Sequence, residues 1–209
     1  MTKKSDLQLL IKALSFAAHK HRFQKRKDEE ATPYINHPIA VASVLINGGG
    51  ITDSEILCAA LLHDTVEDTE TLPEELTETF GSSISGIVME VTDDRSLPKA
   101  ERKQTQVDHA PHLSTKAKAV KLADKTCNLR DVAENPPHWW PLERRQQYFD
   151  WGKRVIDGLR GDWPELEALF DQQYQVRPGE ETLKQRAERY SREMADNLNE
   201  NAKKGTLTP

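Results

Sequence analysis

Apolar residues in this chain of 209 residues recur at the spacing of an amphipathic helix, and no segment alternates convincingly between apolar and polar residues. Near the start, Leu7, Leu10, Ile11 and Leu14 share one helical face. A chain of this kind buries its apolar surface by packing helix on helix. We therefore predict an all-α fold of about eight to ten helices in a single bundle. Later helices are expected at 83–92, 98–109, 115–134, 141–159 and 164–173.

Two helices in the first third of the chain carry boundary signals. Pro38 begins a short apolar helix, which the glycines at 48–50 terminate. Thr52 and Glu55 have the spacing of a capping box, in which a side-chain oxygen accepts a hydrogen bond from the first turn. This box is expected to open a very apolar helix over 55–64, with the sequence EILCAALLHD.

Composition limits the partners of the chain. It contains 29 Lys and Arg against 34 Asp and Glu, a formal net charge of −5. This charge argues against binding nucleic acid or an anionic membrane through the overall electrostatic field of the protein. No apolar run approaches the roughly 20 residues of a membrane-spanning helix. Cys58 and Cys127 lie in apolar stretches, and the start of the chain lacks the features of a secretory signal. We expect two reduced thiols and a cytoplasmic location.

Three apolar stretches are each interrupted by an imidazole or a carboxylate. His37 lies in YINHP, and His63 and Asp64 end the helix over 55–64. Asp124 lies within AVKLADKTCNL. Such groups are costly in an apolar interior unless they are paired or bind a metal. One divalent cation would relieve all three interruptions, and two His with two Asp suit Mn²⁺, Fe²⁺ or Zn²⁺ better than Ca²⁺.

The alternative for a lone histidine on an apolar face is an ordinary buried residue with satisfied hydrogen bonds. We apply that interpretation, or a surface one, to the remaining histidines, which are His19, His21, His109, His112 and His138. The His–Asp pair at 63–64 differs from them because further acidic residues follow it in HDTVED.

Glu67 and Asp68 follow the His–Asp pair at helical spacing. If the helix continues, Asp64 and Asp68 lie about 6 Å apart on one face, so the two later carboxylates lie one turn beyond the proposed ligands. An acid or base at that distance could act on a metal-bound water. The alternative is that Glu67 and Asp68 begin a solvated loop, since threonines surround them.

Several ordered motifs give the chain a family resemblance. The segments TPYINHP, AALLHDTVEDT, VTDD, LPKAERK and VKLADKTCNLRD resemble the hydrolase domain of RelA/SpoT-type proteins, within the HD-domain metal phosphohydrolases. They are most similar to stand-alone small alarmone hydrolases, including the metazoan SpoT-homologue type. The resemblance covers roughly residues 5–172. It implies a catalytic body over 1–175, with the polar, helix-prone residues 176–209 as a C-terminal extension.

The resemblance also implies a reaction and a site. The expected substrate is guanosine 3′,5′-bis(diphosphate) or its pentaphosphate relative, which would lose the 3′-pyrophosphate to give GDP or GTP. Glu67 and Asp68 match the acid–base pair. The metal, usually Mn²⁺, would be held by His37, His63, Asp64 and Asp124. Positions that the family uses on the substrate match Arg26, Lys27, Lys99, Asn128, Arg144 and Tyr148.

Alternatives remain open at several of these positions. Arg26 and Lys27 belong to the run KRK, and Lys99 to a second basic cluster with Arg102 and Lys103, and such runs are often only solvated. Tyr148 either flanks a nucleoside or packs in the core. Rival functions are an NADPH 2′-phosphatase or another nucleotide phosphohydrolase, a silent nucleotide-sensing module and a plain helical interaction protein. The oligomeric state, monomer or homodimer, is left open.

Overall fold

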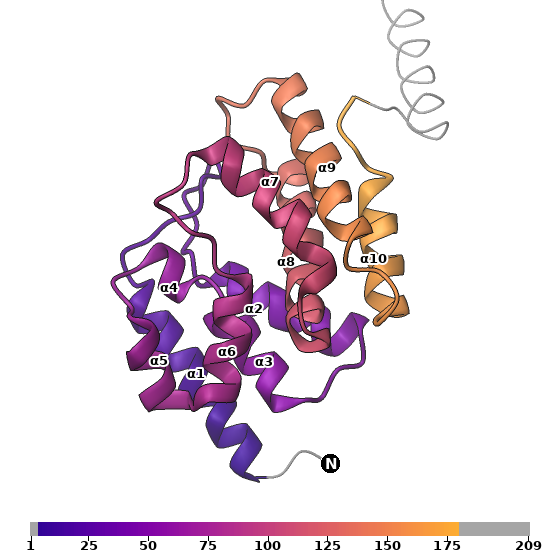
Figure 1. The fold of residues 1–209 in the computed structure, drawn as a ribbon. Helices are drawn as coiled ribbons and strands as arrows, with labels where there is room; N and C mark the ends of the chain where they lie inside the picture. Colours follow the sequence, from indigo (N-terminus) through magenta and orange to yellow (C-terminus); the bar gives the residue numbers. More distant parts are fainter. Residues whose placement is uncertain (1–3, 180–209) are drawn as a thin grey trace, which may run out of the picture.

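The computed structural model describes residues 4–179, and within this range the chain is helical with connecting loops and contains no β-strand (Figure 1). An isolated bridge joins Lys25 to Pro33. The predicted all-α class is confirmed. The elements in chain order are α1 (Lys4–Lys20), α2 (Asn36–Ser43), the π-helical turn η1 (Val44–Gly48), α3 (Ser54–Leu62), α4 (Thr65–Asp68), α5 (Pro73–Phe80), α6 (Ser82–Val91), α7 (Lys99–His109), the 3-10 turn η2 (Ala110–His112), α8 (Thr115–Glu134), α9 (Leu142–Asp157) and α10 (Pro164–Tyr174).

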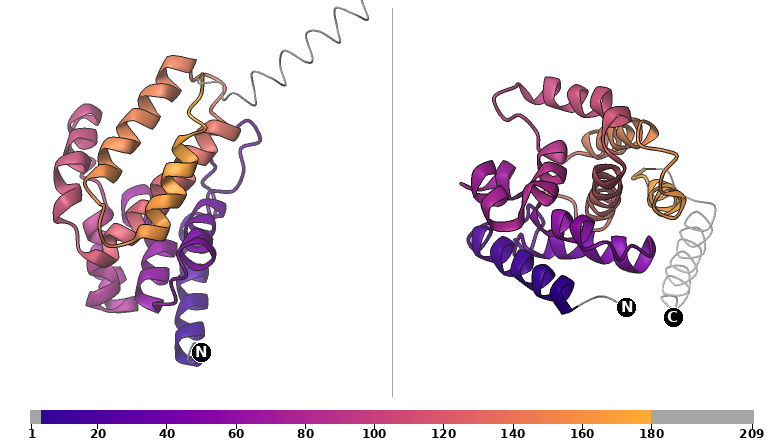
Figure 2. Two further views of the ribbon diagram at one scale, coloured as in Figure 1. Left: turned by 90° about the vertical axis from the view of Figure 1, so that its right-hand side faces the viewer. Right: turned by 60° about the horizontal axis from the view of Figure 1, so that its bottom comes forward.

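Helix α8 lies in the middle of the body, and Figure 2 shows other helices around it. It packs against α2, α3, α6, α9 and α10. Apolar side chains such as Leu122 and Leu129 are fully buried. The charged residues Lys121, Asp124 and Lys125 are almost fully buried as well. A helix buried on most sides holds its polar groups away from water, so these three residues require partners inside the protein.

Helix α3 is the second buried element. Every residue from Ile56 to Leu62 is buried, against α1, α2, α6 and α8. The helix ends at Leu62, two residues before the predicted end, and the short helix α4 begins at Thr65. The Asp68 N–H still donates to the Asp64 carbonyl, at 2.8 Å. The chain therefore keeps a helical turn after Asp64 but in a separate helix.

The start of α3 corrects one prediction. The capping side chain is Asp53, not Thr52, and its carboxylate accepts the N–H groups of Glu55 at 2.8 Å and Ile56 at 3.4 Å. Lys116 on α8 also lies 2.8 Å from this carboxylate. Aspartate is a strong N-cap because its charge complements the helix dipole as well as the free N–H groups.

The ends of the chain leave part of the predicted organisation untested. Residues 180–209, most of the predicted extension over 176–209, lie outside the described residues, so the division at 175 stays a prediction. Pro178 is anchored to α9, because its carbonyl accepts a hydrogen bond from Gln146 Nε2 at 3.0 Å. None of the helices between residues 4 and 179 is both long and apolar enough to cross a membrane.

We expect Asp53→Ala to lower the free energy of unfolding by about 1 kcal/mol, the usual cost of losing an N-cap. Asp53→Asn keeps the capping oxygen and loses only the ion pair with Lys116, so it should cost less. Thr52→Ala, at the exposed neighbouring position, is the control and should leave stability unchanged. Urea denaturation measures all three, and an equal loss in Thr52→Ala would contradict the assignment of the cap.

Candidate active site

Three helical elements bring two imidazoles and a carboxylate to one point. His37 on α2, His63 just after α3 and Asp124 on α8 are buried, and each offers a ligand atom within 4.8 Å of the other two. Asp124 Oδ1 lies 3.1 Å from His37 Nε2 and 3.7 Å from His63 Nε2. Residues that are up to 87 positions apart in sequence therefore meet where the sequence predicted a cation.

Asp64, the fourth predicted ligand, lies beside this cluster. Its Oδ2 is 3.0 Å from His63 Nε2 and 3.8 Å from His37 Nε2. The same oxygen accepts a hydrogen bond from the Tyr34 hydroxyl at 2.6 Å. The structure thus places all four predicted ligands at one centre, which we call the His–Asp cluster.

The donor set fits a divalent metal. His63 Nδ1 donates to the Ala60 carbonyl at 2.8 Å, which leaves Nε2 facing the cluster. This Nε2 is buried and makes no well-aligned hydrogen bond within the described residues, although a carboxylate oxygen is near. An inward-facing imidazole nitrogen fixed by a backbone carbonyl is the usual arrangement of a metal-ligating histidine.

Burial and charge pull the pKa values of the cluster in opposite directions. Burial lowers the pKa of His37. Burial is the largest single influence on His63 and lowers its pKa, but the charges and hydrogen bonds of Asp64 and Asp124 together outweigh burial and raise that pKa to about 10. Burial alone would raise the pKa of Asp124, yet Lys125, together with His37 and His63, holds it well below the usual range. Carboxylates that stay ionised inside the protein are suited to bind a cation.

Two further side chains hold Asp124 in place. Lys125 Nζ donates to its Oδ2 at 3.1 Å, and Asn128 Nδ2 donates to its Oδ1 at 2.5 Å. Asn128 was predicted to contact substrate. It does line the pocket described below, but its amide is already engaged with the proposed metal ligand.

Glu67 and Asp68 project from α4, half-buried. Asp68 Oδ2 accepts a hydrogen bond from Gln24 Nε2 at 2.9 Å, and Glu67 Oε2 accepts the Asp93 N–H at 3.1 Å. Arg95 contacts both carboxylates, with its Nε 3.5 Å from Glu67 Oε1. Burial raises the pKa of Glu67, and the charges of Asp93 and Asp64 raise it further. Glu67 therefore binds a proton more readily than a glutamate in water does.

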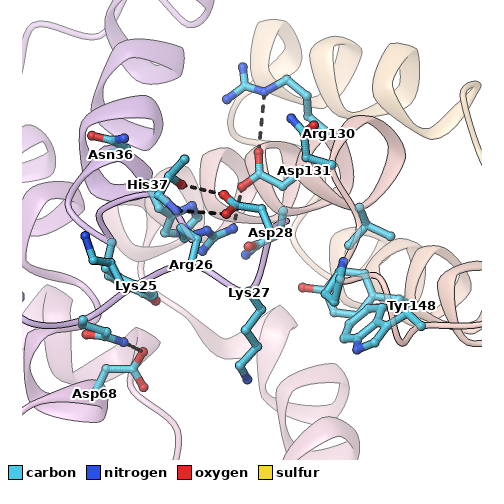
Figure 3. Close-up of a pocket in the computed structure, with 18 of the residues that line it drawn as sticks. Lys25, Arg26, Lys27, Asp28, Asn36, His37, Asp68, Arg130, Asp131 and Tyr148 are labelled. Atoms are coloured by element: carbon cyan, nitrogen blue, oxygen red, sulfur yellow. Dashed lines mark hydrogen bonds and ion pairs between the residues drawn. The ribbon is translucent and has the colours of Figure 1, made fainter. Parts of the chain in front are cut away.

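A pocket of about 1220 Å³ opens beside the His–Asp cluster, and His37, Tyr34 and Asp68 are part of its wall. In the view of Figure 3, Arg26 and Lys27 lie between Asp68 on one side and Tyr148 on the other. The wall holds eight Lys and Arg side chains and three Asp, so it is strongly positive in a chain of net charge −5. Such a pocket favours a polyanion. All six predicted substrate residues line it, namely Arg26, Lys27, Lys99, Asn128, Arg144 and Tyr148.

The pocket residues also contact one another. Arg26 NH2 lies 2.5 Å from Asp131 Oδ2 on α8, so this cation already has a partner. The Arg144 guanidinium lies over the Trp140 ring, 4.3 Å from its centroid. Tyr148 contacts Trp140 and Trp151 at centroid distances of 5.5 and 5.3 Å. Tyr148 therefore packs on aromatic rings and also lines the pocket, and its contact with a nucleoside stays a prediction.

Sequence reasoning missed several residues that surround the site. Tyr34 stands three residues before His37 in a motif whose resemblance was noted, but a tyrosine there carries no chemical signal alone. Arg95 follows VTDD, and only the fold shows that it reaches Glu67. Gln24 and Lys103 also line the pocket, and neither was predicted as a substrate contact.

The fold and the His–Asp cluster together define an HD domain, and the family model described as HD domain matches residues 13–148. The chain belongs to this family. Within it, the chain is similar to proteins named guanosine-3′,5′-bis(diphosphate) 3′-pyrophosphohydrolase MESH1. The one from Xenopus tropicalis is 55% identical over 170 residues, which are 81% of this chain and 95% of the relative. The one from Homo sapiens is 51% identical over 173 residues, covering 83% of this chain and 97% of the relative.

A solved structure gives the same grouping. It is described as a metazoan ortholog of SpoT that hydrolyses ppGpp and plays a role in starvation responses. It matches with a TM-score of 0.79 and 48% identity, covering 81% of this chain and 95% of that chain. The predicted resemblance to the hydrolase domain of RelA/SpoT-type proteins is therefore confirmed.

We expect His63→Ala to abolish tight binding of a divalent ion, because it removes the donor that the Ala60 carbonyl directs at the cluster. The metal content of protein dialysed against Mn²⁺ and then against metal-free buffer measures this. His112→Ala, at an exposed position away from the cluster, is the control and should retain the metal. Full retention in His63→Ala would show that the cluster is not the metal site.

Proposed function

We propose that this protein is a metal-dependent hydrolase of guanosine 3′,5′-bis(diphosphate) and its pentaphosphate relative, which releases the 3′-pyrophosphate and leaves GDP or GTP. The observation that carries this proposal is a cationic pocket with the His–Asp cluster and Asp68 at its edge. The phosphate groups of a bound nucleotide would pair with the cations of the pocket. The His–Asp cluster would then lie beside one of these phosphate groups. The chain covers 95% and 97% of two relatives that are named for this activity.

We take the metal to be Mn²⁺, held by His37, His63, Asp64 and Asp124. Mixed imidazole and carboxylate donors suit Mn²⁺, Fe²⁺ and Zn²⁺, and the family resemblance favours Mn²⁺ among them. A bound ion of this kind polarises a phosphoryl oxygen and makes water more acidic. The protein's own contribution is to hold the donors in place, through Ala60 for His63 and through Lys125 and Asn128 for Asp124.

Glu67 and Asp68 divide the proton transfers between them in this proposal. Asp68 lines the pocket and accepts a hydrogen bond from Gln24, so it is placed to orient the attacking water and take its proton. Glu67, whose pKa burial raises, is suited to protonate the ribose 3′-oxygen as it leaves. Water attacks the phosphorus that is attached to the ribose 3′-oxygen. The bond between that phosphorus and the 3′-oxygen breaks, the 3′-oxygen takes a proton, and pyrophosphate is released.

The cations of the pocket bind the phosphate groups and offset the charge that develops on them. Lys27 and Lys99 are exposed and have no carboxylate within 4 Å among residues 4–179, so they are available to a ligand. Arg26 would bind a phosphate group either in place of Asp131 or in addition to it. Trp140 and Tyr148 give the far wall flat apolar surface for a nucleoside. The choice of guanine rests on the relatives.

We also propose that the protein acts in the cytoplasm and that residues 1–175 form the catalytic body. Cys58 and Cys127 are buried free thiols, which suits a reducing compartment. The described lining of the pocket runs from Gln24 to Tyr148, and residues 176–179, the described part of the chain after 175, do not belong to it.

Product analysis tests the proposed reaction. Incubation of the tetraphosphate with Mn²⁺ should release pyrophosphate and GDP, and a chelated sample should release neither. Orthophosphate from NADPH without pyrophosphate from the tetraphosphate would favour the 2′-phosphatase. Tight nucleotide binding without any product would favour the sensing module.

The carboxylate pair gives a sharper test. Glu67→Gln and Asp68→Asn preserve shape and remove the acid–base function, so turnover should fall by roughly 10²-fold or more while the bound metal is retained. Asp64→Ala should lose metal and turnover together. Loss of metal in all three variants would contradict the separation of ligands from the acid–base pair.

Lys103 supplies a pH dependence. Burial lowers its pKa, and the positive charges of Lys99 and Lys125 lower it further, to about 8. It is therefore charged below about pH 8 and loses its charge above, so its attraction for phosphate declines as pH rises through that value. Because kcat/KM reports the ionisation of the free enzyme, the ratio of wild type to Lys103→Arg should fall across about pH 8. A constant ratio from pH 7 to 9 would show that Lys103 does not contact the substrate.

A further inference from the structure

We propose that the buried His21 and the half-buried Gln24 are positioning residues that orient the Asp68 carboxylate for the reaction. This inference rests on the proposed function and adds a support for Asp68 that runs from Gln24, in the pocket wall, to His21, which is not part of that wall. His21, interpreted from the sequence as an ordinary core or surface histidine, is only 2% exposed and lies where the chain leaves α1.

A short chain of hydrogen bonds connects His21 to Asp68. The Nδ1 of His21 and the Oε1 of Gln24 are 2.6 Å apart. Gln24 Nε2 then donates to Asp68 Oδ2 at 2.9 Å, across 44 positions of sequence. The backbone fixes the same geometry, because the Gln24 N–H donates to the His21 carbonyl at 2.9 Å and the Gln24 carbonyl accepts the Tyr34 N–H at 3.0 Å. Gln24 is therefore held on both sides before its side chain reaches Asp68.

The direction of each hydrogen bond follows from the last acceptor. An ionised carboxylate can only accept, so the amide nitrogen of Gln24 faces Asp68 and its oxygen faces His21. His21 must then donate from Nδ1. Burial lowers the pKa of His21, so the neutral ring carries a single N–H. Its Nε2 is buried without a hydrogen-bond partner among the described residues, as expected if the proton is on Nδ1.

His21 also supports the metal side of the site. Its ring stacks on Tyr34, with centroids 4.8 Å apart and planes at 29°. The Tyr34 hydroxyl donates to Asp64, one of the four proposed ligands. One buried imidazole therefore lies behind both Asp64 and Asp68. The need for such a support is clear from α4, because a helix of four residues is too short to hold its side chains by itself.

Two substitutions at His21 separate hydrogen bonding from packing. His21→Phe keeps a ring to stack on Tyr34 and removes the donor to Gln24. His21→Asn removes the ring and keeps an amide nitrogen near the position of Nδ1. We expect His21→Phe to lower kcat for pyrophosphate release by roughly 10-fold or more, with KM and bound Mn²⁺ unchanged, and His21→Asn to stay within about 3-fold of wild type. The reverse order of the two variants would mean that His21 acts by packing alone and would overturn the proposal.

Gln24 provides the matched test at the next link. Gln24→Met preserves length and removes both hydrogen bonds, so it should lower kcat by a similar factor with the metal retained. Gln24→Glu places a carboxylate against Asp68 and should be worse than Gln24→Met. Wild-type activity in Gln24→Met would refute the proposed role.

A measurement without turnover keeps this inference separate from the proposed function. Nitrogen-15 NMR of labelled histidine reports which ring nitrogen carries the proton, whatever the enzyme hydrolyses. We expect His21 to be neutral with its proton on Nδ1 in the wild type and to lose that preference in Gln24→Met. An Nε2 proton in the wild type would overturn the hydrogen-bond chain even if pyrophosphate release is observed. The Nδ1 proton with no hydrolysis of the tetraphosphate would instead refute only the proposed function.

Discussion

The carboxylate of Asp124 lies inside the protein on a helix that is buried on most of its surface, and much of the site follows from the need to compensate that charge. An isolated ion in such a position is strongly destabilising, and breaking one buried pair commonly costs about 3–5 kcal/mol. Lys125 and Asn128 on the same helix satisfy part of the demand. His37 and His63 arrive from two other helices and complete the surroundings. The packing of α2, α3 and α8 is therefore also what assembles the His–Asp cluster.

The distribution of charge explains how an acidic chain can offer a site for a polyanion. The surplus of acidic residues is spread over the whole chain, whereas eight Lys and Arg gather around a single pocket. Carboxylates remain inside the pocket region only where they have a defined partner, as Asp131 has in Arg26. A concave positive wall raises the local concentration of phosphate-bearing molecules, whereas the net negative charge of the chain disfavours non-specific binding of nucleic acid.

Local sequence patterns predicted the helices well and the contacts around the site less well. The expected helix over 115–134 has the observed bounds of α8, whose first turn is capped by the Ser114 side chain. The cap of α3 was assigned one residue too early, since two adjacent polar residues compete for that role and only geometry decides between them. The four residues that meet in the His–Asp cluster could be found because charge within an apolar run is visible in the sequence, and their role as metal ligands stays a prediction. The partnership of Arg26 with Asp131, 105 positions away, and the support of Asp68 by Gln24 depend on tertiary packing that no local pattern encodes.

The contrast between Arg95 and Lys125 sets how the site responds to the surrounding solution. The Arg95 side chain is 55% exposed and holds Glu67 and Asp68 from the rim, whereas the Lys125 side chain is only 5% exposed and holds Asp124 from within. Dissolved ions screen exposed pairs over a length of about 8 Å at physiological ionic strength but reach buried pairs poorly. A higher salt concentration therefore weakens the ion pairs of Arg95 with Glu67 and Asp68, whereas the ion pair of Lys125 with Asp124 is little affected.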